Sequence, residues 1–115
     1  MELTVYLNFS LAAQSSVAKR QTIHRIQQSL QPYHFEAAAE EGRFVVKLSS
    51  PNWPEGVFQL LDFAQQLGRH WRVSGKIRHG FDAFSSEICI TGVAAASMMC
   101  ENPFSAPSML PQYEA

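Results

Sequence analysis

Hydrophobic positions in the first fifty residues change from a spacing of two to a helical spacing. Alternating Leu3, Val5, Leu7 and Phe9 predict a strand over residues 2–9 with one buried face. Apolar residues then recur at Ile23, Ile26 and Leu30. We expect a helix there that begins at Ser15 or Ser16 and ends before Pro32.

The clearest helix in the sequence follows residue 52. Asn52 is a suitable N-cap, Pro54 fits a first turn and Gly68 supplies a stop. The predicted buried stripe is Val57, Leu60, Leu61, Ala64 and Leu67. From residue 71 the spacing returns to two, which predicts a strand over residues 71–78 with one basic face.

Residues 33–49 have the pattern of a β-hairpin. A two-residue turn at Glu41-Gly42 would place Glu36 opposite Lys47 and Ala37 opposite Val46. This register pairs opposite charges on one face and apolar residues on the other. A slip of one residue would turn the apolar set toward water, so the pattern favours this register.

The rest of the chain has a weaker pattern. We expect a loop over residues 80–83, a strand over residues 87–93 and a short helical turn over residues 94–99. The order is then strand, helix, strand, strand, helix, strand, plus one extra C-terminal strand. This order is typical of a ferredoxin-like split β-α-β sandwich, an α+β fold whose antiparallel sheet carries two helices on one face.

The expected order of strands in this sheet is two, three, one, four, five. We predict one ferredoxin-like domain over residues 1–100 and a Pro-rich C-terminal tail over residues 101–115.

Composition narrows the functional classes only slightly. The 115 residues are 46% hydrophobic with a formal charge of −1, which favours neither nucleic acid nor a membrane as partner. Cys89 and Cys100 form no CxxC pair and suit buried thiols in a reducing compartment. Without a signal-peptide pattern or a membrane-spanning run, we expect a cytoplasmic, soluble protein.

The sheet face away from the helices is the first candidate site. Its predicted partner-binding residues are Tyr6, Val45, Arg72, Lys76 and Arg78, and the predicted tail contacts are Phe104, Leu110 and Tyr113. An open face of this kind suits self-association or another protein partner, as in an adaptor or an inhibitor or immunity protein. Alternatively, the tail covers the face within one chain.

Single-stranded RNA binding is the second candidate function. Tyr6, within Val5-Tyr6-Leu7, resembles the first-strand aromatic of RNA-recognition modules, and the sequence from Gly42 to Val45 resembles their third-strand motif. The resemblance implies base stacking on Tyr6 with Arg72, Lys76 and Arg78 on phosphates.

A small-anion or metabolite site at the helix N-termini is the third candidate. The residues predicted to meet there are Ser10, Ser15, Ser16, Ser49, Ser50 and Asn52. Free N–H groups and hydroxyls at helix N-termini hold anions, and ordinary helix capping requires the same residue types.

An enzyme is the least favoured interpretation. His24, His34, His70 and His79 have no metal-binding spacing. Cys89 is best explained as an inert buried thiol. We therefore predict no catalytic residues, no metal and no cofactor.

Overall fold

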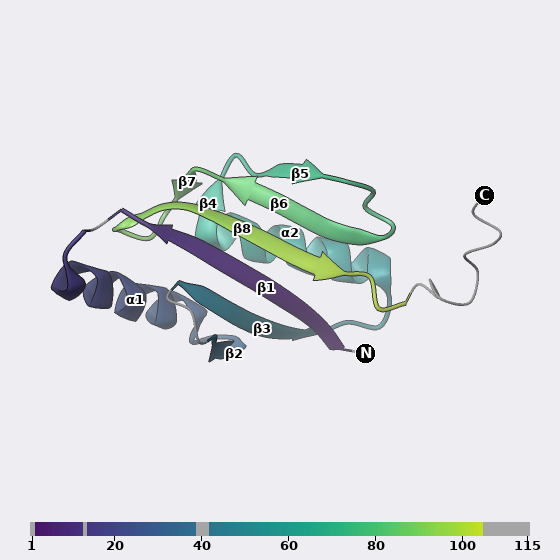
Figure 1. The fold of residues 1–115 in the computed structure, drawn as a ribbon. Helices are drawn as coiled ribbons and strands as arrows, with labels where there is room; N and C mark the ends of the chain where they lie inside the picture. The colour runs from purple at the N-terminus through teal and green to yellow at the C-terminus, as the bar shows by residue number, and fades with distance from the viewer. Residues whose placement is uncertain (1, 13, 39–41, 105–115) are drawn as a thin grey trace.

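The computed structural model describes residues 2–12, 14–38 and 42–104. Within them the chain forms two helices, a large antiparallel sheet of six strands and a small sheet of two (Figure 1). The first elements are β1 (Glu2–Leu11), α1 (Ser16–Leu30), β2 (His34–Ala37), β3 (Arg43–Ser49) and α2 (Trp53–Leu67). The later elements are β4 (Gly68–Arg69), β5 (Arg72–Ser74), β6 (Gly80–Ser85), β7 (Glu87–Ile88) and β8 (Val93–Glu101).

The predictions for β1 and for both helices are confirmed. Ser15 caps α1, where its Oγ accepts a hydrogen bond from the Ala18 N–H at 3.2 Å. Asn52 caps α2 in the same way, with Oδ1 accepting from the Glu55 N–H at 2.9 Å. Gly68 is the C-cap of α2, as expected. Leu61 is exposed rather than buried, because the buried stripe of α2 runs through Phe63 instead.

One hydrophobic core lies between the helices and the large sheet. From β1 it receives Leu3, Val5, Leu7 and Phe9, from the helices mainly Ile26, Leu30, Leu60, Phe63 and Leu67, and from the last strands Phe81, Ala83, Met98 and Cys100. Figure 1 shows the helices on the same side of the sheet. The protein is thus a mixed α+β fold with one helix-covered sheet face.

The strand order differs from the expected one. The large sheet has the order β2-β3-β1-β8-β6-β5, so β5, its first strand after α2, lies at the far edge and β8 occupies the place beside β1. A central strand must bury one face along its length. β8 does this over nine residues, whereas β5 has only three, all exposed. The chain therefore winds inward from the edge, β5 to β6 to β8 (Figure 1).

Three further predictions in the C-terminal third are wrong. Residues 80–83, expected to form a loop, belong to β6, and residues 94–99, expected to form a helical turn, belong to β8. The expected strand over residues 87–93 contains only the two residues of β7 and the start of β8. Pairing with β1 and β6 on both sides overrides the helical preference of the alanine run in β8.

The hairpin register is shifted by two residues from the prediction. Glu36 pairs with Val45 rather than Lys47, and Ala37 pairs with Phe44 rather than Val46. Residues 38 and 43 close the connection through the Ala38 N–H and the Arg43 carbonyl at 2.8 Å, so it contains four residues instead of two. The predicted turn residue Glu41 lies outside the described residues. A shift of two preserves the face of every side chain.

Candidate functional site

The face of the large sheet opposite the helices, hereafter the open face, is uncovered by any described element. Strand register places its side chains in rows across the sheet. The middle row is Glu36, Val45, Tyr6, Met99, Asp82 and Ser74, from β2 to β5. The next row is Arg43, Asn8, Ser97, Phe84 and Arg72, from β3 to β5. Lys47 and Thr4 lie on the other side of the middle row.

Large apolar side chains are exposed in the centre of the open face. The exposed fractions are 50% for Tyr6, 46% for Met99 and 49% for Phe84. Tyr6 and Met99 are direct partners across β1 and β8, and with Arg43, Val45 and Asp82 they line a shallow hollow of about 490 Å³. An apolar centre of this kind within a polar sheet face is typical of an interaction surface.

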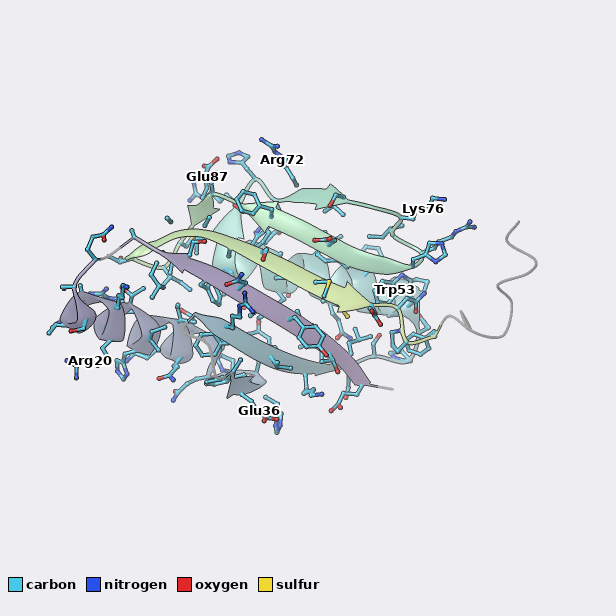
Figure 2. All side chains as sticks on the ribbon, viewed as in Figure 1. Arg20, Glu36, Trp53, Arg72, Lys76 and Glu87 are labelled. Atoms are coloured by element: carbon cyan, nitrogen blue, oxygen red, sulfur yellow. The ribbon has the colours of Figure 1, made fainter. Side chains whose placement is uncertain are left out.

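The predicted partner-binding residues divide into two groups. Tyr6 and Val45 lie together on the open face, and Arg72 lies on the same face at the β5 edge (Figure 2). Lys76 and Arg78 do not lie on the sheet. Gly75, at φ +76°, begins the turn that ends β5, and the His79 N–H donates to the Lys76 carbonyl at 2.9 Å. The predicted continuous basic strand is therefore wrong.

The connection between β5 and β6 is anchored to α2. Nε1 of Trp53 donates a hydrogen bond to the Ile77 carbonyl at 2.7 Å. On the other side, Nδ2 of Asn102 donates to the Arg78 carbonyl at 2.7 Å. Figure 2 shows Lys76 at the end of the sheet near Trp53, away from Arg72. These contacts hold the loop, with its basic residues Lys76 and Arg78, at the end of the sheet.

Of the predicted tail contacts, only Phe104 lies within the described residues. It packs partly buried against the core, and its N–H donates to Oδ1 of Asn102 at 2.9 Å. Pro103 lines a second hollow together with Thr4 and Tyr6. Leu110 and Tyr113 lie outside the described residues. The described chain therefore stops beside the open face.

The structure separates the residues of the predicted anion site. β1 and β3 are antiparallel, and Ser49 pairs with Glu2, at the end of β1 remote from Ser10. Ser10, Ser15 and Ser16 thus lie at one end of the sheet, and Ser49, Ser50 and Asn52 at the other. Ser15 and Asn52 cap their own helices, and Ser50 is buried with its Oγ donating to the Asn52 carbonyl at 2.9 Å. The prediction of a single cluster is wrong, because neighbouring antiparallel strands end at opposite ends of the sheet.

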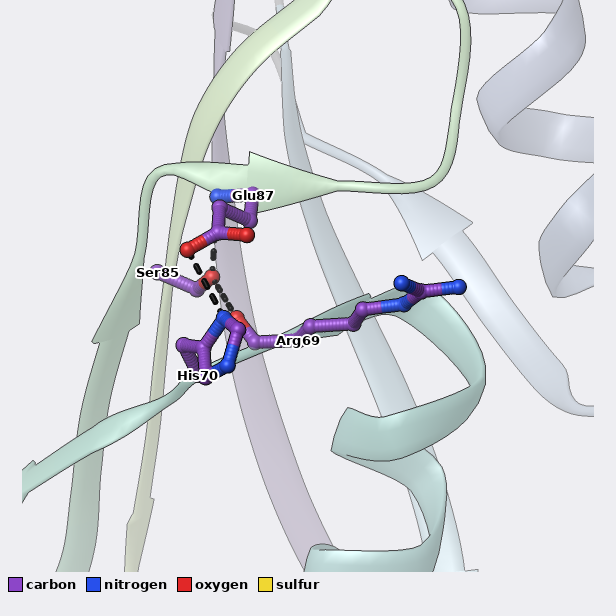
Figure 3. Close-up of polar contacts among 4 residues, drawn as sticks. All are labelled: Arg69, His70, Ser85 and Glu87. Atoms are coloured by element: carbon purple, nitrogen blue, oxygen red, sulfur yellow. Dashed lines mark hydrogen bonds and ion pairs between the residues drawn. The ribbon is translucent and has the colours of Figure 1, made fainter.

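A small polar cluster joins β4, β6 and β7 (Figure 3). Nδ1 of His70 lies 2.8 Å from Oε2 of Glu87, and Oγ of Ser85 donates to the Arg69 carbonyl while accepting from the Glu87 N–H. His70 has φ +53°, an uncommon conformation for a residue with a side chain. The Ser85 hydroxyl is bonded to backbone groups and not to His70, so the cluster lacks the serine-to-histidine contact of a catalytic dyad.

The two cysteines have different environments. Cys100 is fully buried, and burial together with the nearby Glu101 carboxylate raises the pKa of its thiol to about 11. Cys89 is exposed, which corrects the expectation that both thiols are buried. It is separated from His79 by the length of β6, so these two residues do not form a nucleophile and base.

A search of the part of the chain that the structure describes found neither a metal-binding cluster nor a membrane-spanning helix. No group of three or more His, Cys, Asp or Glu side chains there is placed to hold a metal ion. Over residues 2–12, 14–38 and 42–104, neither helix has the length and apolar character needed to span a bilayer. Comparisons with protein-family models, curated proteins and solved structures found no significant match to this chain.

Two exposed apolar residues of the open face were missed from sequence. Phe84 alternates with Phe81, Ala83 and Ser85, which are buried, so a period of two was present in β6. Met99 follows the buried Met98 in the same way within β8. The glycine at the start of β6 obscured the first signal, and the alanine run in β8 obscured the second.

Proposed function

We propose that this chain is a non-catalytic binding module that binds a protein through its open face. One observation carries the proposal: Tyr6, Met99 and Phe84 are each about half exposed on a sheet face that no described element covers. Burying such side chains against a partner is favourable, and aromatic residues and methionine are enriched in protein interfaces. The module is a variant of the split β-α-β arrangement in which β8 takes the central place.

The charges of the open face support a protein rather than a nucleic acid as partner. Arg43, Lys47 and Arg72 share the face with Glu36 and Asp82, so positive and negative groups alternate across the strands. Binding to a phosphate backbone depends on a positive field. A mixed surface around an apolar centre instead favours a partner with its own mixed charges.

Site-specific photo-crosslinking tests this proposal with a matched pair of positions. A photoreactive phenylalanine analogue replaces Phe84 on the open face in one variant and Phe58 on the exposed side of α2 in the other. We expect a discrete protein adduct from position 84, in the producing cells or after purification, and none from position 58. Equal labelling at both positions, or no adduct at position 84, would refute the proposal.

The same preparation tests the RNA alternative. If RNA occupies the open face, nucleic acid will co-purify, as measured by the ratio of absorbance at 260 and 280 nm, and Tyr6→Ala will release it. That result would replace the proposed function. A nucleic-acid-free protein with a position-specific adduct would support it.

A further inference from the structure

We propose that the protein bound by the open face is a second copy of this chain, stacked face to face about a two-fold axis that runs along the strands between β1 and β8. The inference rests on the proposed function. Two-fold dimers require a self-complementary surface, in which each group meets a group of opposite or matching character on the partner. The order and register of the strands supply such a surface.

This axis defines which strands meet. Rotation about a line between β1 and β8 places β1 of one copy over β8 of the other, β3 over β6, and β2 over β5, because these pairs are equidistant from the line. The rows of side chains stay in register, since the axis runs along the strands. Two sheets packed in this way lie about 10 Å apart with interdigitating side chains.

The charges of the open face are opposite at the positions that this axis brings together. Asp82 of β6 comes over Val45 of the second copy, between Lys47 and Arg43 of its β3. Glu36 of β2 comes over Ser74 of the second copy, beside Arg72 of its β5. Figure 2 shows Glu36 and Arg72 at opposite edges of the same sheet, as a two-fold contact between them requires. Each contact occurs twice.

The apolar groups are also complementary about this axis. Tyr6 lies over Met99 of the second copy, and the register places Arg43 over Phe84. A thioether against an aromatic ring and a guanidinium over a ring face are both favourable contacts. The half-exposed side chains of the open face are thereby buried against one another.

A two-fold axis across the strands is disfavoured by the same residues. Such an axis would stack each strand on its own copy and exchange the outer rows. Lys47 would then lie over Arg43 of the second copy, and Arg43 over Lys47. Like charges facing one another oppose association. The sequence of β3 therefore selects the axis along the strands.

The open face has sufficient area for a dimer. With strands about 4.8 Å apart and residues about 3.4 Å apart along each strand, the 39 residues of the six strands give the face a flat projection of roughly 640 Å². Its accessible surface exceeds this projection because side chains stand out from it. The face is thus comparable with the roughly 800 Å² that each partner buries in a standard interface.

Charge exchange at the sheet edges tests the dimer and its axis. In Glu36→Arg the new arginine meets Arg72 of the second copy, and in Arg72→Glu two glutamates meet. Each variant alone is expected to dimerise about tenfold more weakly than the original protein. An equimolar mixture of the two variants restores both contacts, so heterodimers form with nearly the original affinity. Sedimentation equilibrium gives the dissociation constants, and circular dichroism verifies folding.

The control is Arg20→Glu, on the exposed side of α1, which changes the net charge as Arg72→Glu does but leaves the open face intact. We expect no change in its dimerisation. Equal effects of Arg20→Glu and Arg72→Glu, or a mixture that fails to restore association, would overturn the proposed axis.

The original protein's mass separates this inference from the proposed function. A monomer at the highest attainable concentration overturns the dimer. A position-84 adduct to a different protein then leaves the binding function intact, whereas the absence of any adduct removes both. Dimerisation that appears only after deletion of residues 105–115 also overturns it, because the occupant of the face is then the chain's own C-terminal segment.

Discussion

The two faces of the large sheet share the same strands but differ in the burial of their side chains. Met98 and Met99 are consecutive residues of β8, yet Met98 is fully buried under the helices and Met99 is 46% exposed. The helix-covered face is almost entirely apolar, and its described strands bury one polar side chain there, that of Ser85. The open face combines apolar residues with acids and bases at alternating positions.

This difference separates the packing that holds the fold together from the proposed association. The covered face needs only close packing, which any well-fitting apolar set provides. The open face carries half-exposed aromatic rings that a stable fold does not require. The proposed association accounts for such residues.

The largest difference between the faces should appear when the two methionines are shortened. Met98→Ala leaves a cavity in the core and should lower the free energy of unfolding by about 2–5 kcal/mol. Met99→Ala should change it by less than about 0.5 kcal/mol at low protein concentration, while weakening association. Urea denaturation measures both. A similar loss for Met99→Ala would mean that its own chain covers it.

A pair of glycines gives the next largest contrast. Gly92 has φ +95°, and a Cβ there would meet the buried Thr22 side chain of α1. Gly92→Ala should therefore lower the free energy of unfolding by about 3 kcal/mol, because it strains the backbone and overpacks the contact with α1. Gly75 has φ +76° and open space around it, so Gly75→Ala should lower the free energy of unfolding by only about 1 kcal/mol. Urea midpoints compare them, and equal losses would show that packing against α1 does not matter.

The buried thiol of the covered face should make stability depend on alkaline pH. Because the pKa of Cys100 is raised from 9.0 to about 11, the folded state holds its proton where the unfolded state loses it. The contribution of the Cys100 thiol to the free energy of unfolding is fully present below pH 9. It falls by at most about 1.4 kcal/mol per pH unit as the pH approaches 11.

Cys100→Ala provides the reference for this pH effect. The difference in unfolding free energy between the original protein and the variant should shrink between about pH 9 and 11. A constant difference would contradict the burial of the Cys100 thiol. A thiol reagent at neutral pH should modify the exposed Cys89 first and Cys100 only on unfolding.

The smallest expected effects are at the helix caps. Ser15→Ala and Asn52→Ala should each lower stability by about 1 kcal/mol, because each removes an acceptor for a helix N–H. Ser10→Ala, which removes no cap, is the control and should be neutral. We expect phosphate to raise the melting temperature of the original protein no more than it raises that of Ser15→Ala or Asn52→Ala. A larger rise in the original protein, abolished by both substitutions, would restore the anion-site interpretation.

Sequence patterns predicted the first two thirds of the fold well because local signals were complete there. Ser15 and Asn52 mark helix starts, Pro32 and Gly68 mark ends, and Leu3 to Phe9 alternate without interruption. The hairpin register failed by two because a period of two cannot distinguish even shifts. Its faces were nevertheless correct, so Tyr6 and Val45 were placed on the open face from sequence alone.

The C-terminal third could not be predicted in this way. Its strands are set by partners distant in sequence: β8 pairs with β1 and β6, and no local feature indicates that β5 lies at the edge. The predicted anion site failed for a related reason. Its residues share a chemistry, but the antiparallel pairing of β1 and β3 places them at opposite ends.

The central position of β8 has a consequence for how the protein is made. During vectorial synthesis every other described element leaves the ribosome before β8, so β1 keeps an unpaired edge and an incomplete core until residues 93–101 have emerged. Closing a sheet with its final strand requires contacts across nearly the whole described chain, which makes folding slow and leaves apolar surface accessible meanwhile. Nascent chains halted before residue 93 should therefore depend strongly on chaperones.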